Sequence, residues 1–120
     1  MKYRNHRIIR QRQRQRLGSR QAPPRAKRYS CYIAFGCLAR DATWPGHLFN
    51  RQVPVGPQGS VVDVHWKQRN VRGMFPGSEN LTTTIYDILD EYVERFGWDR
   101  VSPVVQTEIG NIAMSAVQSA

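Results

Sequence analysis

The stretch LTTTIYDILDEYVERFGW, residues 81–98, contains the clearest structural signal in this chain of 120 residues. Its apolar residues recur at the spacing of one face of an amphipathic helix: Leu81, Ile85, Ile88, Leu89, Tyr92, Val93 and Phe96. Ser78 is a suitable N-cap, Glu79 suits the first turn, and Gly97 suits the position after the last turn. The acidic residues lie outside the apolar stripe, which predicts a solvated surface: Asp87, Asp90, Glu91 and Glu94.

The residues that follow predict a second helix. Ser102 would cap it and Pro103 would occupy its first position. Apolar residues then repeat nearly the same spacing: Val105, Ile109, Ile112, Ala113, Ala116 and Val117. Two such helices joined by a short connector form an αα-hairpin, whose apolar faces must be covered by the sheet or by another subunit. We therefore expect a homo-oligomer that forms through the C-terminal helices or through a sheet edge.

Short strands are predicted upstream of the two helices. Residues 29–38 are apolar on both faces, which is typical of a central, buried strand. Residues 48–55 predict a strand that Pro54 would place at a sheet edge. Residues 62–67 alternate apolar and polar side chains, as a half-exposed strand does, and residues 71–75 predict one more short strand. The predicted class is α+β: a short antiparallel sheet of three or four strands followed by two amphipathic C-terminal helices, with a disordered basic N-terminal arm.

The net charge of +9 is distributed unevenly along the chain. Residues 1–28 contain nine Arg, two Lys and no acidic residue, whereas residues 29–120 contain seven basic and nine acidic residues. A segment with so many cations and so few apolar side chains cannot bury enough surface to offset its ordering entropy, and Pro23-Pro24 interrupts a helix. We expect residues 1–28 to be an arginine-rich arm and linker, and residues 29–120 to be a single compact α+β domain.

The charge of the arm requires a polyanionic partner. Fifteen of the eighteen basic residues are Arg, whose guanidinium makes bidentate contacts with phosphate and stacks on bases. Arginine-rich segments commonly fold on RNA, so RNA is favoured over DNA. The arm residues predicted to contact RNA are Arg4, Arg7, Arg10, Arg12, Arg14, Arg16, Arg20, Arg25, Lys27 and Arg28.

A second RNA-contact surface is predicted in the body. Trp44 could stack on a base or cap a duplex end. The cations of this surface are Arg51, Lys67, Arg69 and Arg72, although ordinary solvation of a hairpin explains the last three equally well. Trp66 and Trp98 are predicted to be core residues, because Trp66 follows the strand alternation and Trp98 adjoins a helix end.

The sequence predicts no enzyme, no cofactor and no metal site. It contains neither GxxxxGK[ST] nor HExxH, no nucleophile accompanies Asp63 and His65, and the three His residues are scattered. Cys31 and Cys37 would lie about 20 Å apart on one strand, which predicts free thiols in a reducing compartment such as the cytoplasm, the nucleus or a virion. No apolar run approaches the length of a membrane span, so no membrane partner is expected.

These features favour a non-enzymatic RNA-binding protein that is a structural component of a virion, such as a capsid protein, or of a ribonucleoprotein. The stretch Pro76–Val93 looks a little like the end of single-stranded RNA phage coat proteins, although those coats lack a basic arm. Val61–Val93 is loosely similar to the core of tombusvirus silencing suppressors, which implies the alternative of a dimer that sequesters duplex RNA. A further alternative is an organellar protein whose Arg-rich, acid-free N-terminus is a mitochondrial targeting sequence.

Overall fold

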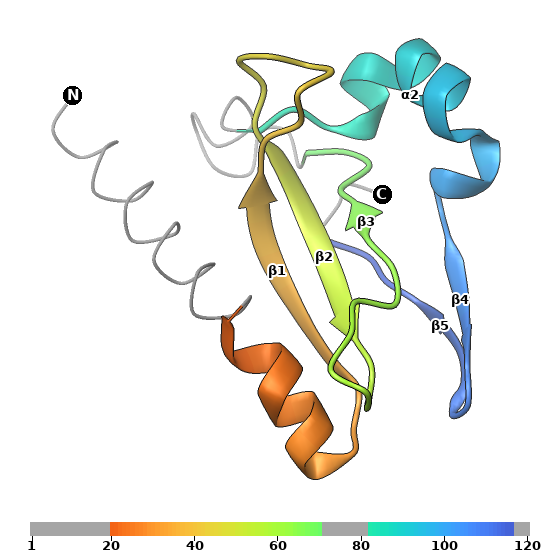
Figure 1. Ribbon diagram of the computed structural model, residues 1–120. Helices are drawn as coiled ribbons and strands as arrows, with labels where there is room; N and C mark the ends of the chain where they lie inside the picture. Colours follow the sequence, from red (N-terminus) through yellow and green to blue (C-terminus); the bar gives the residue numbers. More distant parts are fainter. Residues whose placement is uncertain (1–19, 71–81, 117–120) are drawn as a thin grey trace, which may run out of the picture. The chain divides into compact units, whose positions relative to one another are not determined.

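The computed structural model describes residues 20–70 and 82–116. The chain divides into two units: Met1–Leu38 with Val53–Val64, and Ala39–Gln52 with His65–Ala120. The described residues form a three-stranded sheet in the order β1-β2-β3, a two-stranded sheet β4-β5, and short helices (Figure 1). The predicted α+β class with short antiparallel sheets is therefore confirmed.

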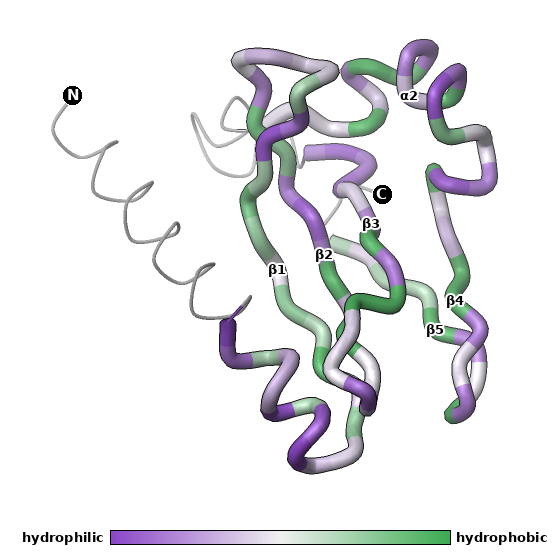
Figure 2. Tube along the Cα trace, viewed as in Figure 1, coloured by the Kyte–Doolittle hydropathy of each residue, from purple (hydrophilic) through white to green (hydrophobic). Residues whose placement is uncertain are grey.

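The first unit contains a helix over residues 20–29, which we call the basic helix. Ala22 and Ala26, one turn apart, are buried and form a cluster with Val55, against which Ile33 and Phe35 pack. Two short apolar stretches interrupt this otherwise hydrophilic helix (Figure 2). The predicted disorder is therefore wrong for residues 20–28, and the predicted boundary at residue 28 falls inside the helix. Residues 1–19 lie outside the described residues.

Pro23 and Pro24 do not prevent the basic helix. Proline holds φ near −65°, which is a helical value, so its cost is a missing N–H donor rather than a strained backbone. The chain also approaches the helix closely, since a Cβ at Gly59 would lie 3.1 Å from the carbonyl oxygen of Pro23. Packing of the two alanines against the strands thus outweighs the local tendency of the prolines to break a helix.

The strand order differs from the prediction. β1 covers Ile33–Ala39, β2 covers Phe49–Val55, and β2 is the central strand while β1 lies at an edge. The sequence predicts that residues 29–38 are central and that residues 48–55 lie at an edge because of Pro54. Proline lacks only a donor, and the carbonyl of Pro54 still accepts a hydrogen bond from the Val62 N–H at 3.0 Å.

β3 is only two residues long, His65–Trp66, and pairs antiparallel with β2 through Arg51↔Trp66 and Gln52↔His65. Both of its residues are buried: His65 is 3% exposed and Trp66 is 7% exposed. The core position predicted for Trp66 is confirmed. The predicted solvent face is wrong at His65, because both faces of this short strand are covered. The strand predicted at residues 71–75 lies outside the described residues.

The helix predicted from residues 81–98 is confirmed in its C-terminal part. A 3₁₀ turn η1, Ile85–Ile88, leads into α2, Leu89–Phe96. The helix ends before Gly97, which adopts φ 87° and donates its N–H to the Val93 carbonyl. A second 3₁₀ turn, η2, then covers Trp98–Arg100.

The start of this helix is later than predicted, with Thr84 as its N-cap. The Asp87 carboxylate accepts hydrogen bonds from the Thr84 N–H at 2.8 Å and from its hydroxyl at 2.9 Å. The preceding residue is extended, since the Thr83 N–H donates to the Leu48 carbonyl at 2.8 Å and Thr83 forms a bridge with Phe49. Ser78 and Glu79, the predicted start, lie outside the described residues.

The predicted second C-terminal helix is wrong. β4, Val104–Thr107, and β5, Gly110–Ala113, form an antiparallel hairpin instead. β-branched residues in β4 favour a strand, and Gly110 adopts φ 119°, which a glycine tolerates at a tight turn. The predicted oligomer contact through a second helix therefore has no structural basis, whereas the contact through a sheet edge stays a prediction.

Candidate nucleic-acid interface

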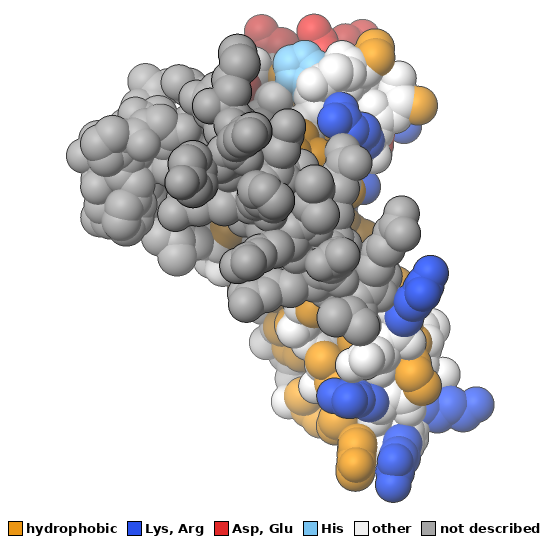
Figure 3. Space-filling model, turned by 90° about the vertical axis from the view of Figure 1, so that its left-hand side faces the viewer, with side chains coloured by type: hydrophobic (Ala, Val, Ile, Leu, Met, Phe, Trp, Pro, Cys, Tyr) orange, Lys and Arg blue, Asp and Glu red, His pale blue; other side chains and the backbone are white. Residues whose placement is uncertain are grey.

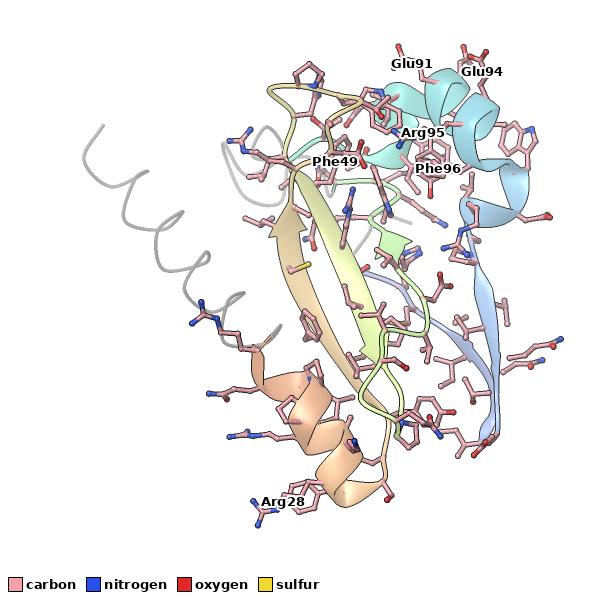
Figure 4. All side chains as sticks on the ribbon, in the orientation of Figure 1. Arg28, Phe49, Glu91, Glu94, Arg95 and Phe96 are labelled. Atoms are coloured by element: carbon pink, nitrogen blue, oxygen red, sulfur yellow. The ribbon has the colours of Figure 1, made fainter. Side chains whose placement is uncertain are left out.

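The basic helix presents four cations to solvent. Ala22 and Ala26 occupy its buried side, so the remaining positions project outward, and the exposed cations are Arg20, Arg25, Lys27 and Arg28. In the view of Figure 3, Lys and Arg side chains project from the lower part of the picture, and no acidic side chain is seen among them. Arg28 points away from the ribbon at the end of the helix (Figure 4).

No ion pair within residues 20–70 and 82–116 neutralises these four cations. Among the described residues, the ion pairs both have Asp41 as the acidic partner and involve Arg51 and Arg95. The guanidinium of Arg28 lies 5.4 Å from the ring centroid of Tyr29, which is 64% exposed. The helix therefore offers uncompensated positive charge, and an aromatic ring at its end, to a partner in solution.

Trp44, a predicted base contact, is instead a core residue with 5% exposure. Its ring centroid lies 5.9 Å from that of Phe49, 5.8 Å from that of Trp66 and 6.3 Å from that of Phe96. The indole N–H donates a hydrogen bond to Glu91. Neighbouring rings therefore cover the indole, so the structure does not expose Trp44 for the predicted stacking on a base or capping of a duplex end.

Arg51 is also engaged within the fold. Its guanidinium lies 3.9 Å from the Trp66 ring centroid and 3.2 Å from Asp41, and 17% of its side chain is exposed. Arg95 contacts the other oxygen of Asp41 at 3.1 Å (Figure 4 shows Arg95 and Phe96 on the inner side of α2). The structure thus does not present Arg51 to a nucleic acid as predicted.

The carboxylate of Asp41 is stabilised in its charged form. Burial by itself would raise its pKa, but hydrogen bonds from Thr43 and the positive charges of Arg95 and Arg51 together lower the pKa below the usual 3.8. The Thr43 N–H donates to Asp41 Oδ1 at 3.0 Å. Asp41 therefore stays ionised well into the acidic range.

Lys67 and Arg69 differ in how accessible they are. Lys67 is half-buried, and burial lowers the pKa of its ammonium group. Arg69 is exposed, and its guanidinium lies 4.2 Å from the ring centroid of Tyr86. The remaining predicted contacts lie outside the described residues: Arg4, Arg7, Arg10, Arg12, Arg14, Arg16 and Arg72.

Sequence reasoning missed the exposure of Tyr86 and Trp98, as it did that of Tyr29. Tyr86 is 43% exposed, and its place off the apolar stripe of residues 81–96 was the signal that could have identified it. Trp98 is 67% exposed, so the prediction that it is a core residue is wrong. The positive φ of Gly97 redirects the chain after α2, which separates Trp98 from the buried face of that helix.

The described residues carry few other chemical features. Cys31 and Cys37 are half-buried cysteines outside any disulfide, and no group of three or more His, Cys, Asp or Glu in the described ranges could hold a metal ion. Within the same ranges, no helix combines the length and apolarity needed to cross a membrane.

No protein-family model matches the chain, and no curated protein is significantly similar to it. The exposed cations and aromatic rings are therefore the features from which a function can be argued.

Proposed function

We propose that this protein is a non-enzymatic RNA-binding protein whose arginine-rich residues 1–28 neutralise phosphate, and that it is a structural component of a virion or a ribonucleoprotein. The observation that carries this proposal is the basic helix, which directs Arg20, Arg25, Lys27 and Arg28 into solvent. Within the described residues none of the four is paired with a carboxylate.

The geometry of the helix suits a phosphate backbone. From Arg20 to Arg28 the helix advances about 12 Å. This is the axial distance of three or four phosphates along one strand of a duplex, at about 3.4 Å each. Because Ala22, Ala26 and Val55 pack together, the helix is held against its unit and its cations need little further ordering when they bind.

The alternative of a duplex-RNA-sequestering silencing suppressor has less support. That function would need Trp44 and the surface of Arg69 and Arg72 as well as the arm, and Trp44 is buried. The alternative of a mitochondrial targeting sequence has a different difficulty. Cleavage after residue 28 would remove Ala22 and Ala26 from the cluster they form with Val55.

The proposal is tested by filter binding of the full-length protein to single-stranded RNA, duplex RNA and duplex DNA over a salt series. About six phosphate contacts predict a loss on the order of a thousandfold in affinity between about 50 and 200 mM salt. A salt-independent affinity of the wild-type protein, or no affinity at all, would overturn the proposal.

A charge-neutral variant of the basic helix tests its share of the binding. Replacing Arg20, Arg25, Lys27 and Arg28 with Gln should reduce the slope of log affinity against log salt by about three, at about 0.7 for each single-strand phosphate contact. The matched control changes the three arginines to Lys and keeps the charge, so its slope should equal that of the wild type. Equal slopes for all three proteins would assign the binding to other cations.

A further inference from the structure

We infer that Arg69 and Tyr86 form a stacking platform for an unpaired base of RNA, which would make single-stranded or looped RNA the preferred ligand. The inference rests on the proposed function and adds a base contact to the phosphate contacts. The two side chains are in the second unit, with the Arg69 guanidinium 4.2 Å from the Tyr86 ring centroid. Both residues are exposed, Tyr86 to 43%.

Backbone hydrogen bonds hold the two residues together. The Tyr86 N–H donates to the Gln68 carbonyl at 3.2 Å, and the Ile85 N–H donates to the Lys67 carbonyl at 3.1 Å. Ile85 is fully buried, so the turn that carries Tyr86 is anchored in the core. The platform is therefore organised before a ligand arrives, which lowers the entropic cost of binding.

No acidic side chain beside the ring competes for Arg69 among the described residues. Asp87 follows Tyr86 in sequence, but its carboxylate accepts the two hydrogen bonds from Thr84 that cap η1. The ion pairs of the described residues do not include Arg69. Its guanidinium remains a planar, charged surface that can stack on a base and contact a neighbouring phosphate.

This arrangement selects for unpaired bases. A base in a continuous duplex already stacks on both of its neighbours, so its face is not available to the platform. Stacking between a base and an aromatic side chain tolerates any sequence, because every base has a π-face. The platform therefore predicts a preference for single strands with little preference for sequence.

The test uses full-length Tyr86→Leu, which removes the ring, and Tyr86→Phe, which keeps it. Affinity of Tyr86→Leu for a single-stranded RNA should fall on the order of tenfold, while its affinity for the same sequence as a duplex and its salt slope should not change. Tyr86→Phe should bind as the wild type does. A 2-aminopurine base in the single strand should be quenched by the wild type and by Tyr86→Phe, and not by Tyr86→Leu.

Two further variants complete the experiment. Arg69→Leu changes an exposed side chain and should also abolish the quench. If Tyr86→Leu does not fold, the quench by Arg69→Leu tests the platform in its place. Trp98→Leu removes an exposed ring that has no guanidinium over it among the described residues, and should leave affinity and quench unchanged.

The outcomes separate this inference from the proposed function. Salt-dependent RNA binding by the wild type without a quench, or with equal losses for Trp98→Leu and Tyr86→Leu, would overturn the platform and leave the phosphate-binding function standing. Equal weakening of single-stranded and duplex binding by Tyr86→Leu would also overturn the platform alone. Absence of salt-dependent binding by the wild type would overturn the proposed function itself.

Discussion

Arg51 and Trp66 lie opposite each other on β2 and β3, with the guanidinium 3.9 Å from the centroid of the Trp66 ring. Asp41 contacts the same guanidinium at 3.2 Å, so the cation is held between an anion and an aromatic face. Trp66 in turn lies 4.7 Å from Phe49 and 5.3 Å from Tyr92, measured between ring centroids. Arg51, which the sequence predicts to contact RNA, thus stabilises the aromatic core of the second unit.

Arg51→Gln should destabilise the protein by about 2 kcal/mol, because it removes both the contact with the Trp66 ring and the ion pair with Asp41. Urea denaturation followed by Trp fluorescence measures the change. Arg40→Gln is the control, since Arg40 is exposed, and it should shift the free energy of unfolding by less than about 0.5 kcal/mol. Equal effects of the two substitutions would contradict a structural role for Arg51.

The stability that Asp41 contributes should depend on pH. Burial alone would raise its pKa, but hydrogen bonds from Thr43 and the charges of Arg95 and Arg51 hold the pKa in the folded protein below the usual 3.8. The contribution is therefore fully present above the unfolded pKa and is lost as the pH falls through the lower, folded pKa. Asp41→Asn should be less stable than the wild type at neutral pH, and the difference should shrink as the pH falls through the folded pKa of Asp41. Urea denaturation over this pH range measures it, and a difference that does not vary with pH would refute the assignment.

Gly59→Ala should loosen the basic helix. Gly59 adopts φ 78°, and an added Cβ would lie 3.1 Å from the Pro23 carbonyl oxygen. Gly46→Ala is a matched control, because Gly46 adopts φ 84° with nothing within 4 Å of the added Cβ. Both substitutions should cost about 1 kcal/mol in backbone strain, and only Gly59→Ala should also accelerate hydrogen exchange of the basic-helix amides. If hydrogen exchange of these amides is unchanged in Gly59→Ala, the helix does not depend on the close contact between Gly59 and Pro23.

Asp87→Ala should destabilise the protein by about 1 kcal/mol, because it removes the acceptor for the Thr84 N–H at the start of η1. Asp90→Ala, one turn further along and exposed, is the comparison and should have a smaller effect. Thermal unfolding followed by circular dichroism compares the two variants with the wild type. If Asp90→Ala proved the more destabilising of the two, the Asp87 carboxylate would not stabilise the start of η1.

The sequence by itself determined the features that depend on local spacing. The division of charge between residues 1–28 and the remainder can be read directly from the chain. The apolar stripe through Tyr92 and the helix end at Gly97 were also predictable, because a helix face repeats every three to four residues and a positive φ favours glycine. The alternation that predicted Trp66 in the core is equally local.

Only the tertiary structure decided the features that depend on residues distant in sequence. Residues 20–29 form a helix because Val55 covers Ala22 and Ala26, a contact that no local pattern contains. Val104–Ala113 fits a helix or a hairpin by composition, and the pairing of β4 with β5 selects the hairpin. Trp44 and Arg51 look like ligand contacts in sequence, yet both pack around Trp66. In each case burial against a distant partner outweighs a local preference of smaller free energy, so these features appear only when the chain is folded.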